Sequence, residues 1–441
     1  MRIHIPDEAK YIIETLENSG HEAHVVGGCV RDALMGKTPE DWDITTSALP
    51  SQTMACFEGS TIIETGLQHG TLTLVLSNKP FEITTFRADG NYSDFRRPDN
   101  VEFIRELKSD LARRDFTINA MAYNPGSGIS DFFGGIEDIE NKIIRCVGDA
   151  DTRFREDALR IMRALRFSSV LDFEIEKNTA ASIFNHCDLL PHIARERISN
   201  ELSKLLLGKR VLKILSDYTR IFEEIIPEIS ETVGFEQNTP YHHLDVWNHI
   251  IASVAVASKD KIIRLTMLLH DIAKPKCYME IDSVGHFHGH EKLSSFMAKD
   301  ILSRLKYDGE TIDAVTQLIL HHGDDIVAER KSVKRWLNRI GEERFHQLIE
   351  VRKSDLMAKV ESKCESRMSK LPSVLTILDE IIAQQQCFSL KDLAIDGNDL
   401  LALGIPEGKE VGDLLNYLLD MVINENANNE KEELLHILQS V

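Results

Sequence analysis

The sequence lacks a C-x-x-C cysteine pair, a long apolar run and an excess of positive charge. Its seven cysteines are scattered through 441 residues, which argues against a disulfide framework or a zinc ribbon and for reduced thiols. No apolar run could span a bilayer, and the N-terminus begins as an amphipathic helix rather than as a signal peptide. The formal net charge of −20 argues against a nonspecific nucleic-acid coat, although a local basic path is compatible with that total. We therefore expect a cytoplasmic protein without membrane contact, and no feature predicts a protein partner.

The pattern of apolar residues divides the chain into a first part with strands and a second part without them. A helix is expected at 7–18, and the predicted strands lie at 23–27, 61–66, 71–76 and 81–87. A polar stretch at 87–110 predicts a mobile loop. After residue 151 helical periodicity runs to the C-terminus. We predict an α+β protein with an α/β head at 1–150, an all-α neck at 151–235, an all-α body at 236–370 and a helical tail at 371–441.

The most informative stretch is Val25–Ala48. Gly27 and Gly28 stand between a strand pattern and a helix pattern, where backbone N–H groups can approach an anion. Asp41 and Asp43 are separated by one residue, so in extended backbone their carboxylates share a face and can hold the same cations. An ordinary turn or a solvated loop explains either half alone. An anion-binding glycine turn together with a metal-binding pair of carboxylates is typical of a phosphoryl or nucleotidyl transferase.

With this spacing, the segment from Gly27 to Asp43 resembles the signature of class II tRNA nucleotidyltransferases, the CCA-adding enzymes, and of related poly(A) polymerases. The resemblance implies a nucleotidyltransferase-type head, tRNA as partner, CTP and ATP as substrates, and nucleotide contacts at Gly28 and Arg31. The segment 113–121 is similar to the family motif RRDFTINAMA, which implies that Arg114 contacts the nucleotide. Without the resemblance, that segment is a helix-like stretch with solvated arginines.

A charged stripe is expected on a helix through 156–167, where Asp157, Arg160, Arg163 and Arg166 recur every three residues. A surface helix with weak ion pairs gives the same pattern. In a sharper interpretation, Asp157 accepts from the exocyclic amino group of cytosine or adenine, and Arg160 donates to the adjacent ring nitrogen. Uracil and guanine present the reversed groups, and each unmatched group costs roughly 1–3 kcal/mol. The segment resembles the family's EDxxR motif, which is assigned this role, and the resemblance makes Arg163 and Arg166 further nucleotide contacts.

The expected reaction uses Asp41 and Asp43 to hold two Mg²⁺ ions, hard cations that suit carboxylate and phosphate oxygens. One ion would activate the RNA 3′-hydroxyl for attack on the α-phosphate, and the other would steady the leaving pyrophosphate. Glu82 is the candidate third carboxylate, although its place on a predicted strand equally fits an outward-facing residue. No residue pattern predicts covalent catalysis.

Further features bear on which nucleotides are added and on how RNA binds. Family members that add only cytidines lack a flexible segment that this chain keeps at 94–99, so CC-only addition is disfavoured and A-only addition stays open. Long homopolymer addition is also disfavoured, because no Arg-rich insertion follows the motif. The neck segment at 195–202 and the tail resemble the family's RNA-binding regions, with the tail docking the tRNA elbow through backbone shape. The basic residues after the neck segment are Lys204, Lys209 and Arg210.

A second group of residues with metal-binding chemistry lies in the body. His249, the doublet His270-Asp271 and Asp355 follow in an order that resembles the HD phosphohydrolase superfamily. Imidazole with carboxylate suits a transition metal such as Ni, Mn, Co or Fe that activates water. The substrate would be a 2′,3′-cyclic phosphate or a phosphate monoester; the alternative is an HD-like scaffold that only carries RNA. Candidates for a second metal position are His290, His321 and His322.

We therefore predict an enzyme that adds CCA to tRNA without a nucleic-acid template and has a second, phosphohydrolase activity in its body. An A-adding tRNA nucleotidyltransferase or a poly(A) polymerase is the alternative within the same class. An HD phosphohydrolase whose head only binds nucleotides is the alternative from another class. The intact pair Asp41 and Asp43 argues against it, and also against a non-catalytic RNA-binding protein.

Overall fold

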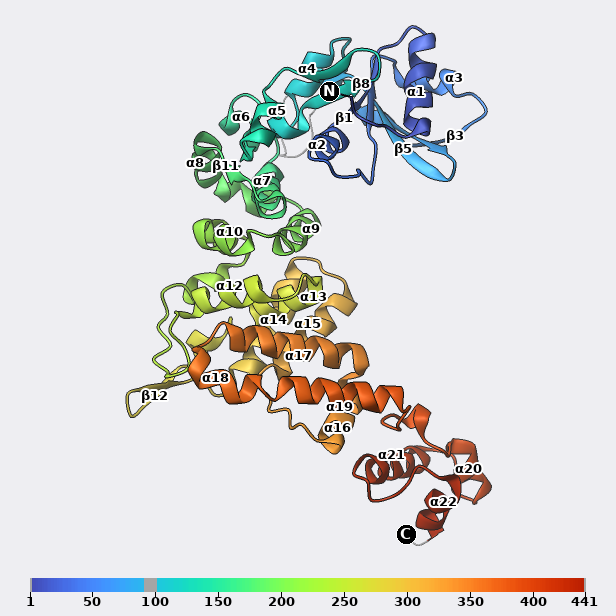
Figure 1. Cartoon of the computed structure of the whole chain (residues 1–441), viewed down its shortest axis with the longest axis vertical. Helices are drawn as coiled ribbons and strands as arrows, with labels where there is room; N and C mark the ends of the chain where they lie inside the picture. The colour runs from blue at the N-terminus through green and yellow to red at the C-terminus, as the bar shows by residue number, and fades with distance from the viewer. Residues whose placement is uncertain (1, 91–100, 440–441) are drawn as a thin grey trace. The chain divides into compact units, whose positions relative to one another are not determined.

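The computed structural model describes residues 2–90 and 101–439, and the chain folds as two compact units, the first ending at Pro227 and the second beginning at Glu228. A mixed sheet with helices occupies the first part of the first unit, and helices make up most of the second unit (Figure 1). The predicted α+β fold class is therefore confirmed. The finer division into head, neck, body and tail stays a prediction, and these names are used below for the residue ranges given above.

The head is built on a seven-stranded sheet in the order β3-β4-β5-β2-β1-β8-β9. β2 and β5 run parallel with Ile44 opposite Ile83, and the other neighbouring strands run antiparallel. Residues of β5 alternate between exposed and buried over most of its length, as expected for a strand with one face on a core. The strands are β1 (Ala23–Val26), β2 (Ile44–Thr46), β3 (Thr61–Gly66), β4 (Thr71–Leu76), β5 (Lys79–Thr85), β8 (Met121–Asn124) and β9 (Gly128–Asp131).

Short helices pack on this sheet. The first, α1 (Asp7–Asn18), buries Ile12, Ile13 and Leu16 in one cluster with apolar residues of β1, β2, β4 and β5. Two acidic residues in its first turn favour the helix, because the N-terminal end of a helix dipole attracts negative charge. The others are α2 (Gly28–Leu34), α3 (Pro50–Cys56) and α5 (Gly135–Glu140).

Three local predictions in the head were incomplete. The hairpin between β4 and β5 turns on Ser77 and Asn78, both with positive φ, so residues 79 and 80 belong to the strand. The stretch at 87–110 contains β6 (Arg87–Asp89), β7 (Val101–Phe103) and α4 (Leu107–Ala112), and the segment at 94–99 lies outside the described residues. The segment after residue 113 is one 3₁₀ turn, η2 (Thr117–Asn119), and the chain then continues as β8, because its apolar residues fill both faces of an interior strand.

The neck is helical, but the single helix expected through 156–167 is two helices. α6 ends at Glu156, and Asp157 has extended backbone, with φ −140° and ψ 100°. Its carboxylate accepts from the backbone N–H of Leu159 at 3.1 Å, so the side chain replaces a helical backbone bond. The neck helices are α6 (Ala150–Glu156), α7 (Leu159–Leu171), α8 (Lys177–Asn185), α9 (Arg195–Leu206), α10 (Val211–Asp217) and α11 (Thr219–Ile225), with a two-residue pairing of β10 (Ile143–Ile144) and β11 (Glu174–Ile175).

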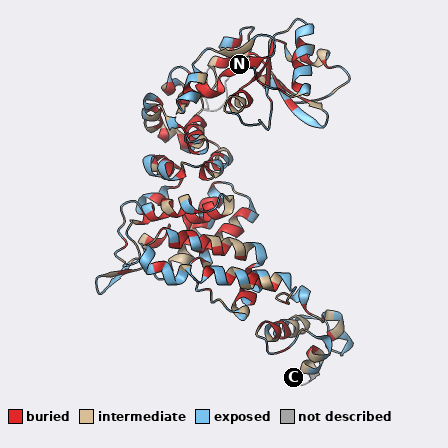
Figure 2. Ribbon diagram, viewed as in Figure 1, coloured by how far each residue is buried: buried red, intermediate tan, exposed pale blue. Residues whose placement is uncertain are grey.

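The second unit is helical except for one small hairpin. Buried residues run along the helices of the body as they do along the strands of the head (Figure 2). Its last three helices enclose a hydrophobic cluster of their own. The elements are α12 (Val246–Val256), α13 (Lys261–Leu269), β12 (Met279–Ile281), β13 (Val284–His286), α14 (His290–Arg304), α15 (Gly309–His321), α16 (Arg330–Ile340), α17 (Glu342–Met357), α18 (Glu361–Met368), α19 (Leu371–Ala383), α20 (Gly397–Ala402), α21 (Lys409–Ile423) and α22 (Lys431–Gln439).

No helix within residues 2–90 and 101–439 is both long enough and apolar enough to cross a bilayer.

Candidate functional site

The first candidate site, the head site, begins at the glycine turn between β1 and α2. Gly27 has φ +83°, and a Cβ there would lie 2.9 Å from Nη1 of Arg114. A Cβ on Gly28 would lie 3.7 Å from Nη2 of Arg31. Two guanidinium groups therefore approach the turn, one from the α4–η2 segment and one from α2. Only glycine combines this backbone conformation with such a close approach.

Arg31 and Arg114 are each held by polar groups of the head. Arg31 donates to Oδ1 of Asn119 at 2.6 Å and to the neighbouring Asp32 at 2.9 Å. The guanidinium of Arg114 lies 3.9 Å from the fully buried carboxylate of Asp110. Burial lowers the pKa of Arg114, and the carboxylates of Asp110 and Asp43 act in the opposite direction. A cation held beside the glycine turn by fixed carboxylates suits an anionic ligand such as a phosphate.

Three carboxylates lie beside this turn. Asp41 and Asp43 precede β2 rather than lying in it, yet both are exposed and the residue between them is buried, so they share a face as predicted for extended backbone. Asp43 directly precedes Ile44 of β2, and Glu82 directly precedes Ile83 of β5, the residue paired with Ile44 in the parallel strands. Although Asp43 is exposed, loss of hydration among the surrounding protein atoms raises the pKa of its carboxyl, as do the charges of Glu82 and Asp41, whereas Arg114 lowers it. Clustered carboxylate oxygens are the donor set that fits Mg²⁺.

The arginines of α7 complete the head site. Arg163 contacts the buried Asp115 at 2.7 Å, and Arg166 bonds to Glu201 of α9. The guanidinium groups of Arg163 and Arg166 lie 5.3 and 3.8 Å from the centroid of the Phe167 ring. The guanidinium of Arg31, from the head, lies 5.1 Å from the same ring. Three of the predicted nucleotide contacts therefore converge on one aromatic side chain, which contributes cation–π attraction.

Sequence analysis overlooked Phe167, Asp115 and Glu201 as organisers of these arginines. The ring of Phe167 is buried and packs edge-on against Phe116 at 5.8 Å, which fixes α7 against the head. The available signal was that Phe167 directly follows the arginine stripe in sequence. Its aromatic type alone did not distinguish it from an ordinary core residue.

Asp157 and Arg160 are not paired with each other. Asp157 binds Arg197 of α9, at 2.8 and 3.3 Å. Arg160 donates to Glu156 at 2.7 Å and to the backbone carbonyl of Arg113 at 3.0 Å, and it is 9% exposed. Both side chains of the predicted base-reading pair are therefore engaged with other protein groups. A base that binds both must take over hydrogen bonds that the protein already makes.

Replacing Asp115 by Asn is expected to destabilise the first unit by about 2–3 kcal/mol at neutral pH. Burial acts to raise the pKa of Asp115, but the opposing effects of Arg163, Asn119 and Arg160 are larger. The pKa is therefore lowered to about 2. Because the folded pKa lies below that of an unfolded aspartate, the stabilisation is present above about pH 4 and is lost as pH falls toward 2. Urea denaturation of the wild type and of Asp115→Asn at pH 7 and at about pH 2.5 measures both effects. The exposed Asp217→Asn is the control, and equal midpoints for all three proteins would contradict the prediction.

The second candidate site, the body cluster, lies wholly in the second unit. His249 of α12, the doublet His270-Asp271 after α13 and Asp355 of α17 are buried, and their ligand atoms all lie within 4.8 Å of one another. Nε2 of His249 lies 3.3 Å from Asp271 and 3.1 Å from Asp355. The four residues predicted from the sequence are therefore brought together by three helices.

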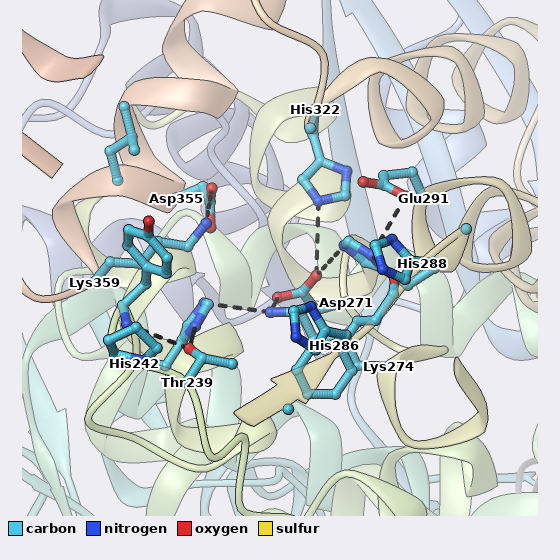
Figure 3. A pocket seen from close by; sticks show the side chains of 18 of the residues that line it. Thr239, His242, Asp271, Lys274, His286, His288, Glu291, His322, Asp355 and Lys359 are labelled. Atoms are coloured by element: carbon cyan, nitrogen blue, oxygen red, sulfur yellow. Dashed lines mark hydrogen bonds and ion pairs between the residues drawn. The ribbon is translucent and has the colours of Figure 1, made fainter. Parts of the chain in front are cut away.

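Asp271 also belongs to a second group. Its Oδ1 lies 3.2 Å from Nε2 of His290 and 3.6 Å from Nε2 of His322, and the three form a cluster of their own. In Figure 3 His322 points toward the carboxylate of Asp271. His321 does not join them, because its Nδ1 contacts Asp324 at 2.7 Å and its ring packs on Trp336. Two of the three residues proposed for a second metal position, His290 and His322, thus meet at the carboxylate of Asp271.

The imidazoles of the body cluster share one orientation. Nδ1 lies 2.7 Å from a backbone carbonyl in His270, His290 and His322, and 3.4 Å from one in His249. Donation from Nδ1–H leaves the lone pair of Nε2 directed at the carboxylates, as in metal-ligating histidines. Both oxygens of Asp271 are buried, and their neighbours are imidazoles and one ammonium group. A buried carboxylate surrounded by imidazoles fits one or two bound transition-metal ions.

A cavity of about 400 Å³ opens over the body cluster. Lys274 contacts Asp271 at 2.7 Å, and Lys359 contacts Asp355 at 2.5 Å, so each ligand carboxylate faces an ammonium group (Figure 3). Burial lowers the pKa of Lys274, while Asp271 acts to raise it. Cations beside a cluster of this kind can hold a phosphate oxygen. Other side chains that line the cavity are Tyr241, His242, His286, His288 and Arg367.

Three family models match successive parts of the chain: the poly A polymerase head domain at residues 23–145, the probable RNA and SrmB-binding site of polymerase A at 172–232, and tRNA nucleotidyltransferase domain 2 at 290–438. CCA-adding enzymes of Lactobacillus delbrueckii subsp. bulgaricus and Anoxybacillus flavithermus are each 34% identical to this chain. The first alignment covers 98% of this chain and 97% of the relative, and the second covers 97% and 95%. The solved structure of the Bacillus stearothermophilus CCA-adding enzyme in complex with CTP matches with a TM-score of 0.73 at 30% identity, over 98% of both chains. A Thermotoga maritima CCA-adding enzyme complexed with tRNA, 20% identical and with a TM-score of 0.61, shares the fold over all of both chains.

Proposed function

Because the chain belongs to the family of CCA-adding enzymes, which are tRNA nucleotidyltransferases, we propose that it adds CCA to the 3′ end of tRNA from CTP and ATP and releases pyrophosphate. One observation on this chain's own residues supports the proposal. Asp41, Asp43 and Glu82 stand beside the Gly27-Gly28 turn, with arginines of head and neck around it.

The chemistry divides between a bound cation and the chain's own side chains. Asp41 and Asp43, with Glu82 beside them, would hold Mg²⁺, which when bound supplies Lewis-acid activation of the 3′-hydroxyl and of the leaving pyrophosphate. Arg31 and Arg114 flank the glycine turn and bind the triphosphate there. Arg163 and Arg166, fixed by Phe167 and their carboxylate partners, orient the nucleotide toward the carboxylates.

Base selection falls to Asp157 and Arg160. Cytosine and adenine both offer an amino donor beside a ring-nitrogen acceptor, and a carboxylate with a guanidinium matches that pair. To read a base, Asp157 exchanges its bond to Arg197, and Arg160 exchanges its bond to Glu156. Bases with the reversed pattern leave the two side chains with their protein partners.

The decisive experiment for the transferase offers tRNA ending at the discriminator base, at C and at CC, with each of the four nucleoside triphosphates separately. CMP is expected on the first two substrates and AMP on the third. Addition of AMP to the CC end with no CMP addition to the shorter ends would favour an A-adding enzyme. Continued addition of AMP beyond the first would favour a poly(A) polymerase.

Replacing Arg160 by Ala is expected to raise UMP and GMP incorporation relative to CMP by about 10- to 100-fold, because cytosine then loses a guanidinium contact that the mismatched bases never make. The KM for CTP should change less than this ratio, since the triphosphate contacts lie elsewhere. Single-nucleotide incorporation with each triphosphate measures both quantities. Arg155→Ala, an exposed arginine of α6, is the matched control, and unchanged selectivity in Arg160→Ala would contradict the assignment.

We also propose a phosphohydrolase activity at the body cluster. His249, His270, Asp271 and Asp355 would hold a transition metal such as Ni, Mn, Co or Fe, and His290 and His322 would complete a second position through Asp271. A metal bound there supplies an activated water. The substrate we expect is a 2′,3′-cyclic phosphate or a phosphate monoester, with Lys274 and Lys359 facing its oxygens. The RNA itself would bind along the neck and the tail.

A further inference from the structure

One helix of the body has a charge pattern opposite to that of the whole chain. The eleven residues of α16 include five lysines and arginines and no acidic residue, in a protein whose formal net charge is −20. Lys331, Arg335 and Arg339 are spaced four residues apart, and all three are exposed. Residues at this spacing lie on one side of a helix. We call these three residues the α16 stripe.

The other two cations of α16 are used inside the fold. Arg330 bonds to Glu380 of α19, and Lys334 is buried, with the charge of Glu425 acting to raise its pKa against the effect of burial. In contrast, no ion pair joins the α16 stripe to a carboxylate anywhere in residues 2–90 and 101–439. The contact of Arg335 to another chain segment is a hydrogen bond to the neutral amide of Asn424. Three cations on one face are thus left without an acidic partner within the fold.

The helix beneath the stripe is rigidly held. Trp336, between Arg335 and the end of the helix, is buried and stacks on Phe345 of α17 with an interplanar angle of 6°. The guanidinium of Arg339 lies 4.9 Å from the centroid of the Trp336 ring, which orders that side chain. A cation that is already ordered loses less conformational entropy when it binds an anion.

We propose that the α16 stripe binds phosphates of the RNA substrate, a role that rests on the proposed function in tRNA processing. Nucleic-acid affinity depends strongly on cations that neutralise phosphates and release counterions. The tail that follows cannot supply them, because residues 371–441 contain thirteen acidic residues and three lysines, with no arginine. The stripe would supply phosphate-binding cations that the tail lacks, and the tail would contribute shape rather than charge.

The test compares the full-length wild type with the triple variant Lys331→Gln, Arg335→Gln and Arg339→Gln. We expect tRNA affinity at about 0.1 M salt to fall by about 10- to 100-fold, and the slope of log affinity against log salt to decrease by about 2–3. The KM for tRNA should rise, while the KM for CTP and kcat at saturating tRNA stay unchanged. The matched control neutralises Lys292, Lys299 and Lys306, which are exposed on and after α14.

A charge-preserving triple variant, Lys331→Arg, Arg335→Lys and Arg339→Lys, separates charge from packing and should retain both affinity and slope. An unchanged slope in the glutamine variant would overturn the proposal, and so would an equal loss of affinity in the charge-preserving variant or in the α14 control. The binding measurement requires no catalysis. A wild type that binds tRNA but incorporates no nucleotide would overturn the proposed function and leave the test of the stripe valid.

Discussion

Replacing Asp43 by Asn is expected to reduce CMP incorporation by about 1,000-fold or more while leaving hydrolysis at the body cluster unchanged. The charges of Glu82 and Asp41 raise the pKa of Asp43, and the charge of the half-buried Arg114 lowers it. An amide in this position provides no negative charge to hold a divalent cation. Single-turnover incorporation of CMP into tRNA at saturating Mg²⁺ measures the loss.

Two further variants make the Asp43 result specific. Glu40→Gln removes an exposed carboxylate from the same loop and should leave the rate within about twofold of wild type. Glu82→Gln should reduce the rate by about 10- to 100-fold if Glu82 is the third carboxylate. CTP binding should persist in Asp43→Asn, because arginines hold the triphosphate. Retention of a tenth of wild-type incorporation by Asp43→Asn would refute the assignment of Asp43.

Replacing Asp271 by Asn is expected to abolish the proposed phosphohydrolase activity and to reduce the amount of metal that the second unit binds. Asp271 belongs to both groups of ligand atoms, so its loss affects each position. His322→Ala should remove one position and leave the other. Elemental analysis after loading with Ni²⁺, Mn²⁺ or Co²⁺, together with hydrolysis of a 2′,3′-cyclic nucleotide, measures both predictions.

The transferase serves as the internal control for the Asp271 variant. CCA addition by Asp271→Asn should match the wild type, since the two clusters lie in separate compact units. Asp282→Asn, an exposed residue of the β12–β13 turn, should change neither metal content nor hydrolysis. Equal metal content in wild type and Asp271→Asn would refute the metal site, whereas loaded metal without hydrolysis would refute only the activity.

The sequence was sufficient for the parts of the fold that depend on local patterns. The alternation of apolar and polar residues predicted β3 and β4, and the amphipathic pattern near the N-terminus predicted α1. It was insufficient for β8, an interior strand buried on both faces, since a short apolar run has no distinguishing period. The break at Asp157 was missed for another reason: a single side-chain-to-backbone bond ends a helix without altering the helical periodicity around it.

Residue spacing along the chain predicted more of the body cluster than of the head site's organisation. His249, His270, Asp271 and Asp355 were recognisable from the sequence because an adjacent His-Asp pair with a flanking histidine and a distant aspartate resembles the HD phosphohydrolase superfamily. The sequence did not show which further histidine joins this cluster. His321 and His322 are adjacent at the end of α15, yet His321 contacts Asp324 and His322 contacts Asp271. Phe167 could not be identified from its type, since its role arises from arginines of two different segments that meet only in the folded unit.

The bonds of Asp157 to Arg197 and of Arg160 to Glu156 mean that both residues proposed to read the base are already hydrogen-bonded before a nucleotide binds. An incoming base competes with side chains that are already satisfied, so discrimination becomes an exchange reaction rather than simple docking into an open slot. A ligand that replaces only one of the two bonds gains little binding free energy, because the protein group that it displaces must be hydrated instead. Fidelity should therefore respond to Arg197 and Glu156, residues that need not touch any nucleotide, as much as to the reading pair itself.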